Sequence, residues 1–201
     1  MGLLVLVRHG QSQWNLENRF TGEVDVDLTA AGEEEAKKAG ALLRGYKFDL
    51  AFTSVLQRAI RSMEIILAES GNHLVALRFK ELNERNYGNL QGLNKEETEK
   101  KFGAAQVIEW RRSFDVAPPG GESLKDTYAR VIPMYQREIE PALKKDLKIL
   151  IVAHGNSLRA LIMYLQRISP DDIVHLNLST GMPMVYEMDA SLNVVRHYTL
   201  S

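Results

Sequence analysis

The sequence predicts an α/β fold with three layers, in which helices cover both faces of a mostly parallel central sheet. Segments typical of strands and of helices alternate along the chain, as in parallel sheets with helical crossovers. Two largely aliphatic runs, at 3–7 and 148–154, suit central strands that are buried on both faces. Each run ends in a histidine followed by a glycine, His9-Gly10 and His154-Gly155.

Length and composition indicate one globular domain. The 201 residues are 45% hydrophobic and 25% charged, which is the mix of a folded chain with a sizeable core. The longest stretch rich in proline, glycine and serine is APPGGES at 117–123, too short for a domain linker. The sequence therefore predicts a single domain over residues 1–201.

Charge and cysteine content exclude several classes of function. The net charge of −1 gives no basic field of the kind that attracts nucleic acid or anionic lipid. The absence of cysteine excludes disulfides, thiolate chemistry and cysteine-based metal sites. No apolar run approaches the length of a membrane span, and no signal peptide is present. We expect a cytoplasmic protein with neither a nucleic acid nor a membrane as partner.

The first part of the chain supplies three strands and two helices. In chain order we expect a strand at 3–7, a helix at 30–46, a strand at 49–54, a helix at 54–70 and a strand at 75–82. Thr29 and Ser54 are suitable N-caps for the two helices. Leu56, Ile60 and Met63 repeat at helical spacing, which supports the second helix.

The second part begins with a long polar and aromatic region at 83–119. The elements expected in it and after it are helices at 95–102 and 105–114, a helix from Ser123 to about Lys145, a strand at 148–154, a helix at 154–165 and strands at 183–189 and 194–200. Pro133 and Pro141 should interrupt the helix that Ser123 begins, because proline cannot donate a backbone hydrogen bond. The last two strands surround an Ala-Ser-Leu-Asn turn and can form an antiparallel edge.

The candidate site lies where the aliphatic strands end. The carboxyl ends of parallel strands meet at one edge of a sheet, so His9, His154 and Arg58 should lie together there, beside Arg8. Guanidinium groups bind phosphate oxygens with two parallel hydrogen bonds, and a neutral imidazole can accept a phosphoryl group. The pattern therefore predicts a phosphoryl-transfer site.

Other interpretations of these residues are less well supported. The Arg8-His9-Gly10 stretch taken alone is equally compatible with a solvated strand end. A metal site at His9 and His154 is disfavoured, since neither motif contains a carboxylate and Arg8 would repel a cation. The histidines at 73, 175 and 197 stand in loop or amphipathic contexts that are typical of structural or solvated residues.

The order of the motifs resembles that of a known family. RHGQSQWN, the Thr21-Gly22 pair, Arg58, ELNERNYGNLQGLNK, WRRSF, GGES and AHGNSLR occur in this order. The same order is found in the cofactor-dependent phosphoglycerate mutases of the histidine phosphatase superfamily, and the similarity covers nearly all of the chain. RHG alone points only to the superfamily, whereas its combination with ERNYG, WRR and HGNSLR is specific for the mutase branch.

The resemblance implies a role for each matched residue. His9 would be the nucleophile that becomes phosphohistidine, with Arg8, Arg58 and His154 around the phosphoryl group. Glu84 would be the general acid and base toward the substrate hydroxyl. The residues implied in substrate binding are Gly10, Gln11, Ser12, Gln13, Trp14, Asn15, Thr21, Gly22, Arg85, Asn86, Tyr87, Lys95, Arg111, Arg112, Gly155 and Asn156. Packing is the alternative role for Trp14, and a solvated face is the alternative for the arginines and Lys95.

The implied activity is the interconversion of 3-phosphoglycerate and 2-phosphoglycerate in glycolysis and gluconeogenesis. The expected cofactor is 2,3-bisphosphoglycerate, which primes the enzyme, and no metal is expected. The alternatives are a bisphosphoglycerate mutase, disfavoured because such proteins tend to have glycine in place of Ser12, a phosphatase of the same superfamily, and a catalytically silent phospholigand-binding module.

This chain departs from the longer members of the family. It runs directly through VAPPGGESL where they carry an insertion, and they have a further C-terminal tail. Glu23 stands where the family commonly has tryptophan. Because the insertion and the tail bear on subunit contacts, both a monomer and a homo-oligomer stay open.

Overall fold

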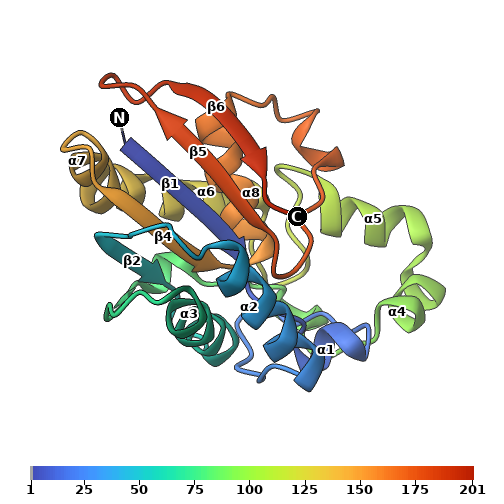
Figure 1. Cartoon of the computed structure of the whole chain (residues 1–201). Helices are drawn as coiled ribbons and strands as arrows, with labels where there is room; N and C mark the ends of the chain where they lie inside the picture. Colours follow the sequence, from blue (N-terminus) through green and yellow to red (C-terminus); the bar gives the residue numbers. More distant parts are fainter. Residues whose placement is uncertain (1) are drawn as a thin grey trace.

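A six-stranded sheet forms the centre of the molecule (Figure 1). The computed structural model describes residues 2–201, and Met1 lies outside the described part. The strands are β1 (Gly2–Arg8), β2 (Leu50–Thr53), β3 (Leu77–Arg78), β4 (Lys148–Ala153), β5 (Pro183–Met188) and β6 (Val194–Thr199), in the spatial order β3-β2-β4-β1-β5-β6. The pairs within β3-β2-β4-β1 are parallel, whereas β5 is antiparallel to β1 and β6 to β5. The predicted mostly parallel sheet with an antiparallel edge is confirmed.

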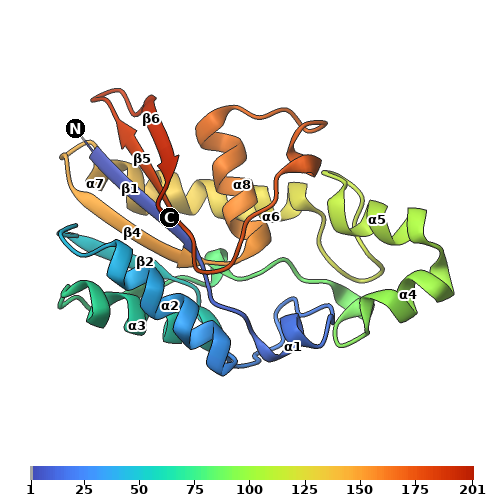
Figure 2. The same cartoon turned by 45° about the vertical axis from the view of Figure 1, so that its right-hand side comes forward.

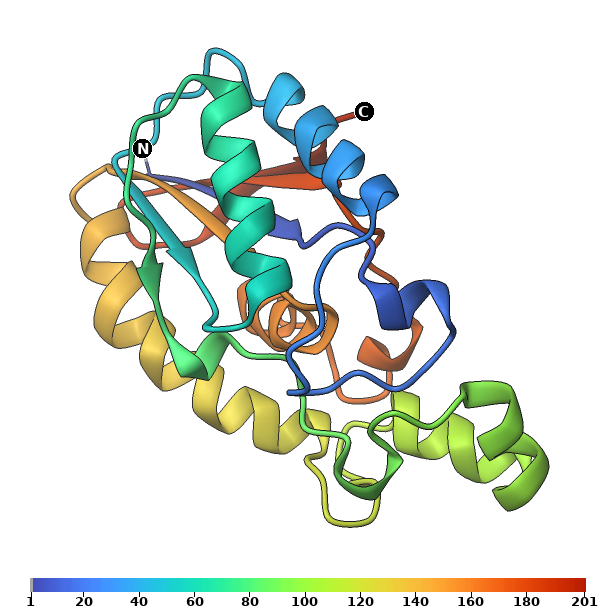
Figure 3. The ribbon, with the colours of Figure 1, turned by 90° about the horizontal axis from the view of Figure 1, so that it is seen from below.

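Helices cover both faces of the sheet, as predicted (Figure 3). On one face lie α2 (Ala30–Leu42) and α3 (Gln57–Ser70), and on the other lie α6 (Leu124–Met134), α7 (Glu140–Leu143) and α8 (Gly155–Gln166). Alternate side chains of each strand point to opposite faces. Val5 and Val7 accordingly pack in the α2–α3 core, while Leu4 and Leu6 pack in the core beneath α6 and α8.

Three helices lie beyond the carboxyl edge of the parallel strands (Figures 1 and 2). They are α1 (Gln13–Leu16), α4 (Lys95–Phe102) and α5 (Ala104–Arg112). The last two confirm the helices expected in the 83–119 region, whereas α1 was not predicted. It is a single turn in which Ser12 accepts a hydrogen bond from the Asn15 backbone and the Asn15 side chain accepts one from Ser12 in return.

Two predicted elements differ from the structure. The strand expected at 75–82 is reduced to the two residues of β3, both exposed, and the chain turns into a 3-10 helix at Lys80–Leu82. The second difference concerns Ser54, which does not cap α3. The helix begins at Gln57 with Leu56 at the N-cap, and the Ser54 hydroxyl oxygen accepts from the Leu56 backbone N–H at 3.2 Å while it also lies 2.7 Å from His154 Nε2.

The long helix after Ser123 changes its hydrogen-bonding pattern instead of breaking. The α-helical α6 contains Pro133 and continues into a π-helical segment, Tyr135–Ile139, which leads into α7 with Pro141 at its start. Because Pro133 lacks a backbone N–H, one hydrogen bond of the helix is missing there, and the wider π-helical turn follows directly. The prolines thus mark the predicted interruption without ending the helix.

The loop after β1 is pressed against the start of α2. A Cβ atom placed on Gly10 would lie 2.1 Å from the Gly32 carbonyl oxygen, and a Cβ on Gly32 would lie 2.1 Å from the Gln11 carbonyl oxygen. The two backbones can approach so closely only because both positions are glycine. This contact fixes the path of the chain directly after His9.

Candidate active site

The two imidazoles lie side by side at the carboxyl edge of the sheet. His9 follows β1 and His154 follows β4, and these strands are neighbours. The ring centroids are 4.9 Å apart with an angle of 60° between the ring planes. Both residues are buried, with exposed fractions of 2% and 0%. The structure thus brings together the two histidines that the sequence placed at one edge.

The His9 ring is held as a neutral base with one free nitrogen. Its Nδ1 atom lies 2.6 Å from the Gly10 carbonyl oxygen. A carbonyl oxygen can only accept, so Nδ1 carries the proton and Nε2 keeps its lone pair. Burial lowers the pKa of His9 well below its usual value, and the charges of Arg58 and Arg8 lower it further. The ring therefore stays neutral at neutral pH, with Nε2 as its nucleophilic nitrogen.

His154 is anchored from the neighbouring strand end. Its Nε2 atom lies 2.7 Å from the hydroxyl oxygen of Ser54, which directly follows β2. Burial lowers the pKa of His154 well below its usual value, and the Arg58 charge and His9 act in the same direction. Two neutral imidazoles thus stand next to each other in a cationic environment.

Two guanidinium groups adjoin His9, that of the buried Arg58 and that of the half-buried Arg8. Arg58, at the start of α3, donates to the carbonyl oxygens of Gly22 (2.7 Å) and Val24 (2.9 Å). Burial lowers the pKa of Arg58 to about 10, so that it stays charged at neutral pH. Arg8 donates to the Leu178 carbonyl oxygen at 2.7 Å, and its Nε atom is buried without a partner. Neither group forms an ion pair with a carboxylate of residues 2–201, so both are free to bind an anion.

Glu84 presents one carboxylate oxygen to the same space. Its Oε1 atom accepts hydrogen bonds from the backbone N–H groups of Arg85 (2.8 Å) and Asn156 (3.0 Å). A Cβ atom placed on Gly155 would lie 3.5 Å from Glu84 Oε2 and 3.7 Å from Arg8 Nε. The open side of Gly155 is therefore where the carboxylate and the guanidinium meet. One oxygen fixes the carboxylate, and the other remains for proton transfer.

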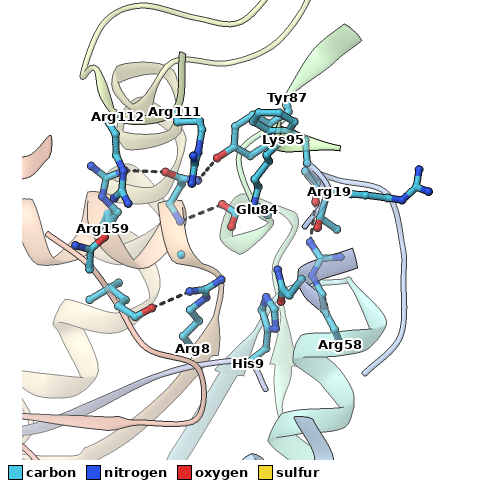
Figure 4. A pocket seen from close by; sticks show the side chains of 18 of the residues that line it. Arg8, His9, Arg19, Arg58, Glu84, Tyr87, Lys95, Arg111, Arg112 and Arg159 are labelled. Atoms are coloured by element: carbon cyan, nitrogen blue, oxygen red, sulfur yellow. Dashed lines mark hydrogen bonds between the residues drawn. The ribbon is translucent and has the colours of Figure 1, made fainter. Parts of the chain in front are cut away.

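A second group of cations faces His9 across the site (Figure 4). Lys95 is the first residue of α4, and Arg111 and Arg112 are the last two of α5. Burial lowers the pKa of Lys95, and the Arg111 charge lowers it further. The same two effects lower the pKa of Arg112. Cations that lower the pKa of one another in this way are stabilised in their charged form when an anion binds between them.

These side chains enclose a cavity of about 230 Å³. The residues that line it are Arg8, His9, Asn15, Arg19, Phe20, Thr21, Gly22, Arg58, Glu84, Tyr87, Lys95, Arg111, Arg112, Gly155, Asn156, Arg159, Leu176, Asn177 and Leu178. Seven of them are arginine or lysine, and one is a carboxylate. A wall with this balance suits a small ligand that carries several negative charges.

The structure places the other predicted residues around the cavity but not in its wall. They are Gly10, Gln11, Ser12, Gln13, Trp14, Arg85, Asn86 and His154. Gln13 is exposed and donates to Glu17, and Trp14 packs against Gly92. Arg85 is fully buried behind the wall and donates to the hydroxyl oxygen of Tyr87 at 3.1 Å.

The sequence interpretation missed Arg19, Phe20, Arg159 and 176–178, which also line the cavity. A signal was present for Arg159, which stands three residues after Asn156 and so on the same face of the helix. No comparable signal marked 176–178, which reach the cavity through the path of a loop.

Two further features bear on the predictions. Within residues 2–201, no three His, Asp or Glu side chains are grouped so that they could hold a metal ion. No helix formed by these residues has the length and apolar character to cross a bilayer.

Comparison with known proteins places this geometry in a family. The model of the histidine phosphatase superfamily (branch 1) matches residues 4–200. The chain belongs to the histidine phosphatase superfamily. A buried, neutral histidine in a cationic cavity is consistent with this family. The match confirms the superfamily that the motifs indicated.

Relatives of this chain carry more specific names. A protein of Cytophaga hutchinsonii named 2,3-bisphosphoglycerate-dependent phosphoglycerate mutase is 58% identical over 194 residues, which cover 96% of this chain and 91% of that protein. A protein of Rhizobium rhizogenes with the same name is 56% identical over 196 residues, which cover 96% and 93%.

Solved structures share the fold at lower identity. A mycobacterial glucosyl-3-phosphoglycerate phosphatase in complex with VO3 has a TM-score of 0.82 and 27% identity, and the match covers 93% of each chain. The alpha-ribazole phosphatase from Shigella flexneri has a TM-score of 0.83 and 25% identity, with 96% of this chain and 94% of that chain covered.

The buried histidines should make the protein less stable at mildly acidic pH. Because the folded state keeps His9 and His154 neutral, the unfolded chain binds more protons below its histidine pKa of about 6.5. Each such group makes the free energy of unfolding fall by up to about 1.4 kcal/mol per pH unit as the pH decreases below that value. Urea denaturation between about pH 5 and 7.5 measures this slope. The His9→Asn variant should show a slope shallower by about one proton, and equal slopes for wild type and variant would contradict the burial effect.

Proposed function

We propose that this protein interconverts 3-phosphoglycerate and 2-phosphoglycerate through a phosphohistidine at His9. The observation that carries the proposal is the pairing of a neutral imidazole and an open carboxylate, His9 and Glu84, within a cavity lined by seven cations. The names of the relatives from Cytophaga hutchinsonii and Rhizobium rhizogenes support the same activity. A cytoplasmic location and action as a single domain over residues 1–201 belong to this proposal.

The cavity fits 2,3-bisphosphoglycerate as the priming compound. Five of its seven cations form two groups, Arg8 and Arg58 beside His9, and Lys95, Arg111 and Arg112 on the opposite side (Figure 4). The compound carries two phosphates, on C2 and C3, which gives one for each group, and its carboxylate is the terminal group at C1. Unpaired buried donors are also present, among them the Nε atom of Arg8. When bound, the compound supplies the phosphoryl group that loads His9.

The free nitrogen of His9 determines the chemistry of transfer. Nε2 attacks the phosphorus atom, and the bond between phosphorus and the departing glycerate oxygen breaks as the nitrogen–phosphorus bond forms. Glu84, which carries a proton when this transfer starts, gives that proton to the departing oxygen and becomes a carboxylate. In the second transfer Glu84 takes the proton of the other hydroxyl as that oxygen attacks the phosphohistidine. Arg8 and Arg58 neutralise the charge on the equatorial oxygens in both directions.

The 83–119 region supplies the cover of the site in this proposal. It contributes Glu84, Tyr87, Lys95, Arg111 and Arg112 to the cavity wall. A mutase must keep water from the phosphohistidine while the bound phosphoglycerate reorients or is replaced by another phosphoglycerate. Cations that hold the ligand's second phosphate therefore favour transfer over hydrolysis.

Removing those cations should turn the enzyme toward hydrolysis. In an Arg111→Ala or Arg112→Ala variant we expect the ratio of phosphate release to mutase turnover to rise by about tenfold, since one charge-assisted bond contributes roughly 1.5 to 3 kcal/mol. The ratio is measured as inorganic phosphate formed per 2-phosphoglycerate formed. Arg196→Ala is the matched control, because this arginine is exposed on β6, remote from the cavity. An unchanged ratio in both site variants would argue against the proposal that the 83–119 region covers the site and keeps water out.

The direct test of the proposed function is a coupled mutase assay with and without 2,3-bisphosphoglycerate, repeated in chelator. We expect 2-phosphoglycerate to form only after priming and at the same rate in chelator. Release of inorganic phosphate without 2-phosphoglycerate would indicate a phosphatase, the activity in the names of the solved structures. If the primed enzyme lost its activity when chelator was added, this result would contradict the metal-independent route.

A further inference from the structure

We propose that Arg159 is a positioning residue that fixes the direction of a row of hydrogen bonds and thereby makes the Tyr87 hydroxyl a donor to the bound ligand. The row runs from Arg159 through Asn156 to Tyr87, along the wall of the cavity. The identity of the ligand, a phosphoglycerate, rests on the proposed function. The direction of the row rests only on the arrangement of the side chains.

Arg159 is a buried cation with neutral partners. It is 5% exposed, and its Nη1 and Nη2 atoms donate to Asn156 Oδ1 (3.0 Å) and to the Ile173 carbonyl oxygen (2.7 Å). Burial lowers the pKa of Arg159 to about 10, and the charges of Arg85 and Arg112 act in the same direction. None of the ion pairs formed within residues 2–201 includes it. Placing a guanidinium here costs stability, which is expected where the charge serves binding.

The guanidinium decides which way the Asn156 amide points. A guanidinium has donors but no acceptor. The atom of Asn156 that faces Arg159 must therefore be the oxygen, and the amide nitrogen must lie on the opposite side. That nitrogen lies 3.2 Å from the hydroxyl oxygen of Tyr87 and donates to it.

The Tyr87 hydroxyl is left with one unused atom, its own hydrogen. Its oxygen accepts one hydrogen bond from Asn156 and a second from Arg85 Nη2, the latter at 3.1 Å. Together the two hydrogen bonds occupy both lone pairs of the oxygen. Neither partner can accept a hydrogen bond from it at these atoms. Since Tyr87 lines the cavity, the hydroxyl hydrogen is available to a ligand oxygen. A carboxylate or phosphate oxygen is the acceptor that such a donor matches.

The electrostatics of the phenol agree with this direction. Burial raises the pKa of Tyr87, but the Arg85 charge and the hydrogen bonds from Arg85 and Asn156 outweigh it, and the pKa is lowered from its usual value. A more acidic hydroxyl is a stronger donor. Without Arg159, the Asn156 amide could turn its oxygen toward Tyr87, and the hydroxyl would then donate to Asn156 instead of to the ligand.

The test combines titration of the free enzyme with kinetics. In the Arg159→Met variant, which keeps side-chain length but has no donor, the pKa of the Tyr87 phenol in the ligand-free enzyme should rise above that in wild type. NMR titration of the tyrosine ring measures it. Arg159→Lys keeps one donor for Asn156 and should preserve the wild-type value even if the methionine variant does not fold. A phenol pKa unchanged in Arg159→Met, or altered as much in Arg159→Lys as in Arg159→Met, would overturn the inference.

Kinetics then show whether Arg159 acts through Tyr87. We expect Arg159→Met and Tyr87→Phe each to raise KM for 3-phosphoglycerate about tenfold, the usual effect of one lost hydrogen bond to a charged group. The double variant should show about the same tenfold increase, because the second change removes nothing more. An increase near a hundredfold would show independent roles and overturn the inference. Absence of mutase activity in wild type would refute the proposed function alone, since the titration needs no substrate.

Discussion

Replacing His9 by alanine is expected to reduce mutase turnover by about 10⁴-fold or more, the usual scale for loss of a catalytic nucleophile. The reason lies in the hydrogen-bond arrangement of the ring. Its Nδ1 proton is directed at the Gly10 carbonyl oxygen, so that Nε2 is the nitrogen with a free lone pair. His154, although it is only 4.9 Å away between ring centroids, has its Nε2 atom engaged by Ser54 and does not line the cavity. The coupled assay at saturating 3-phosphoglycerate measures the loss.

The matched control for His9→Ala is His73→Ala, since His73 is exposed and does not line the cavity. We expect the control to retain wild-type turnover. Both variants should unfold at similar denaturant concentrations at neutral pH. Turnover in a folded His9→Ala variant within about a hundredfold of wild type would rule out the covalent route.

The Glu84→Gln change should lower kcat by about 10²- to 10⁴-fold, the range of general acid–base catalysis. Glutamine has the same shape, and its side-chain oxygen can accept the same two backbone hydrogen bonds, from Arg85 and Asn156. Its amide nitrogen then faces the cavity and can neither give up nor take the substrate proton. We therefore expect a large fall in kcat with little change in the affinity for 3-phosphoglycerate.

Steady-state kinetics and equilibrium binding of 3-phosphoglycerate separate these two effects. Glu97→Gln removes an exposed carboxylate of α4 and serves as the control, for which we expect wild-type kinetics. A Glu84→Gln enzyme with kcat within tenfold of wild type would show that another group moves the proton. A large loss of affinity would instead show that Glu84 contributes to the shape of the site.

The sheet and its two histidines could be predicted because their signals are local. The aliphatic runs of β1 and β4 have no polar residue in the interior, so each had to be a buried strand. Parallel strands end at the same edge, and this rule alone placed His9 beside His154. The cations from 85 to 112 could be assigned to the site only through the resemblance, because arginine and lysine on helices usually face solvent.

The remaining differences arise from contacts between distant parts of the chain. Ser54 has the sequence features of an N-cap, but the helix starts three residues later, and the Ser54 hydroxyl is shared between the Leu56 backbone N–H and His154, a residue 100 positions later. Arg159 shares a helix face with Asn156, which the spacing could have indicated, but its burial depends on contacts with Asn156 and with the Ile173 carbonyl oxygen that the spacing does not specify. The alternation at 75–82 predicted a strand, yet β3 forms only two pairs with β2 and leaves Leu77 exposed. In each case tertiary packing, which short sequence windows do not contain, decides the outcome.

The site of covalent phosphorylation is the most direct measurement of this mechanism. The enzyme is incubated with 2,3-bisphosphoglycerate, digested under alkaline conditions that preserve phosphohistidine, and analysed by tandem mass spectrometry and phosphorus NMR. We predict an acid-labile phosphoryl group on Nε2 of His9 and none in the His9→Ala variant. A phosphoryl group on Nδ1 of His9 or on His154, or turnover by wild type with no phosphohistidine at all, would contradict the mechanism.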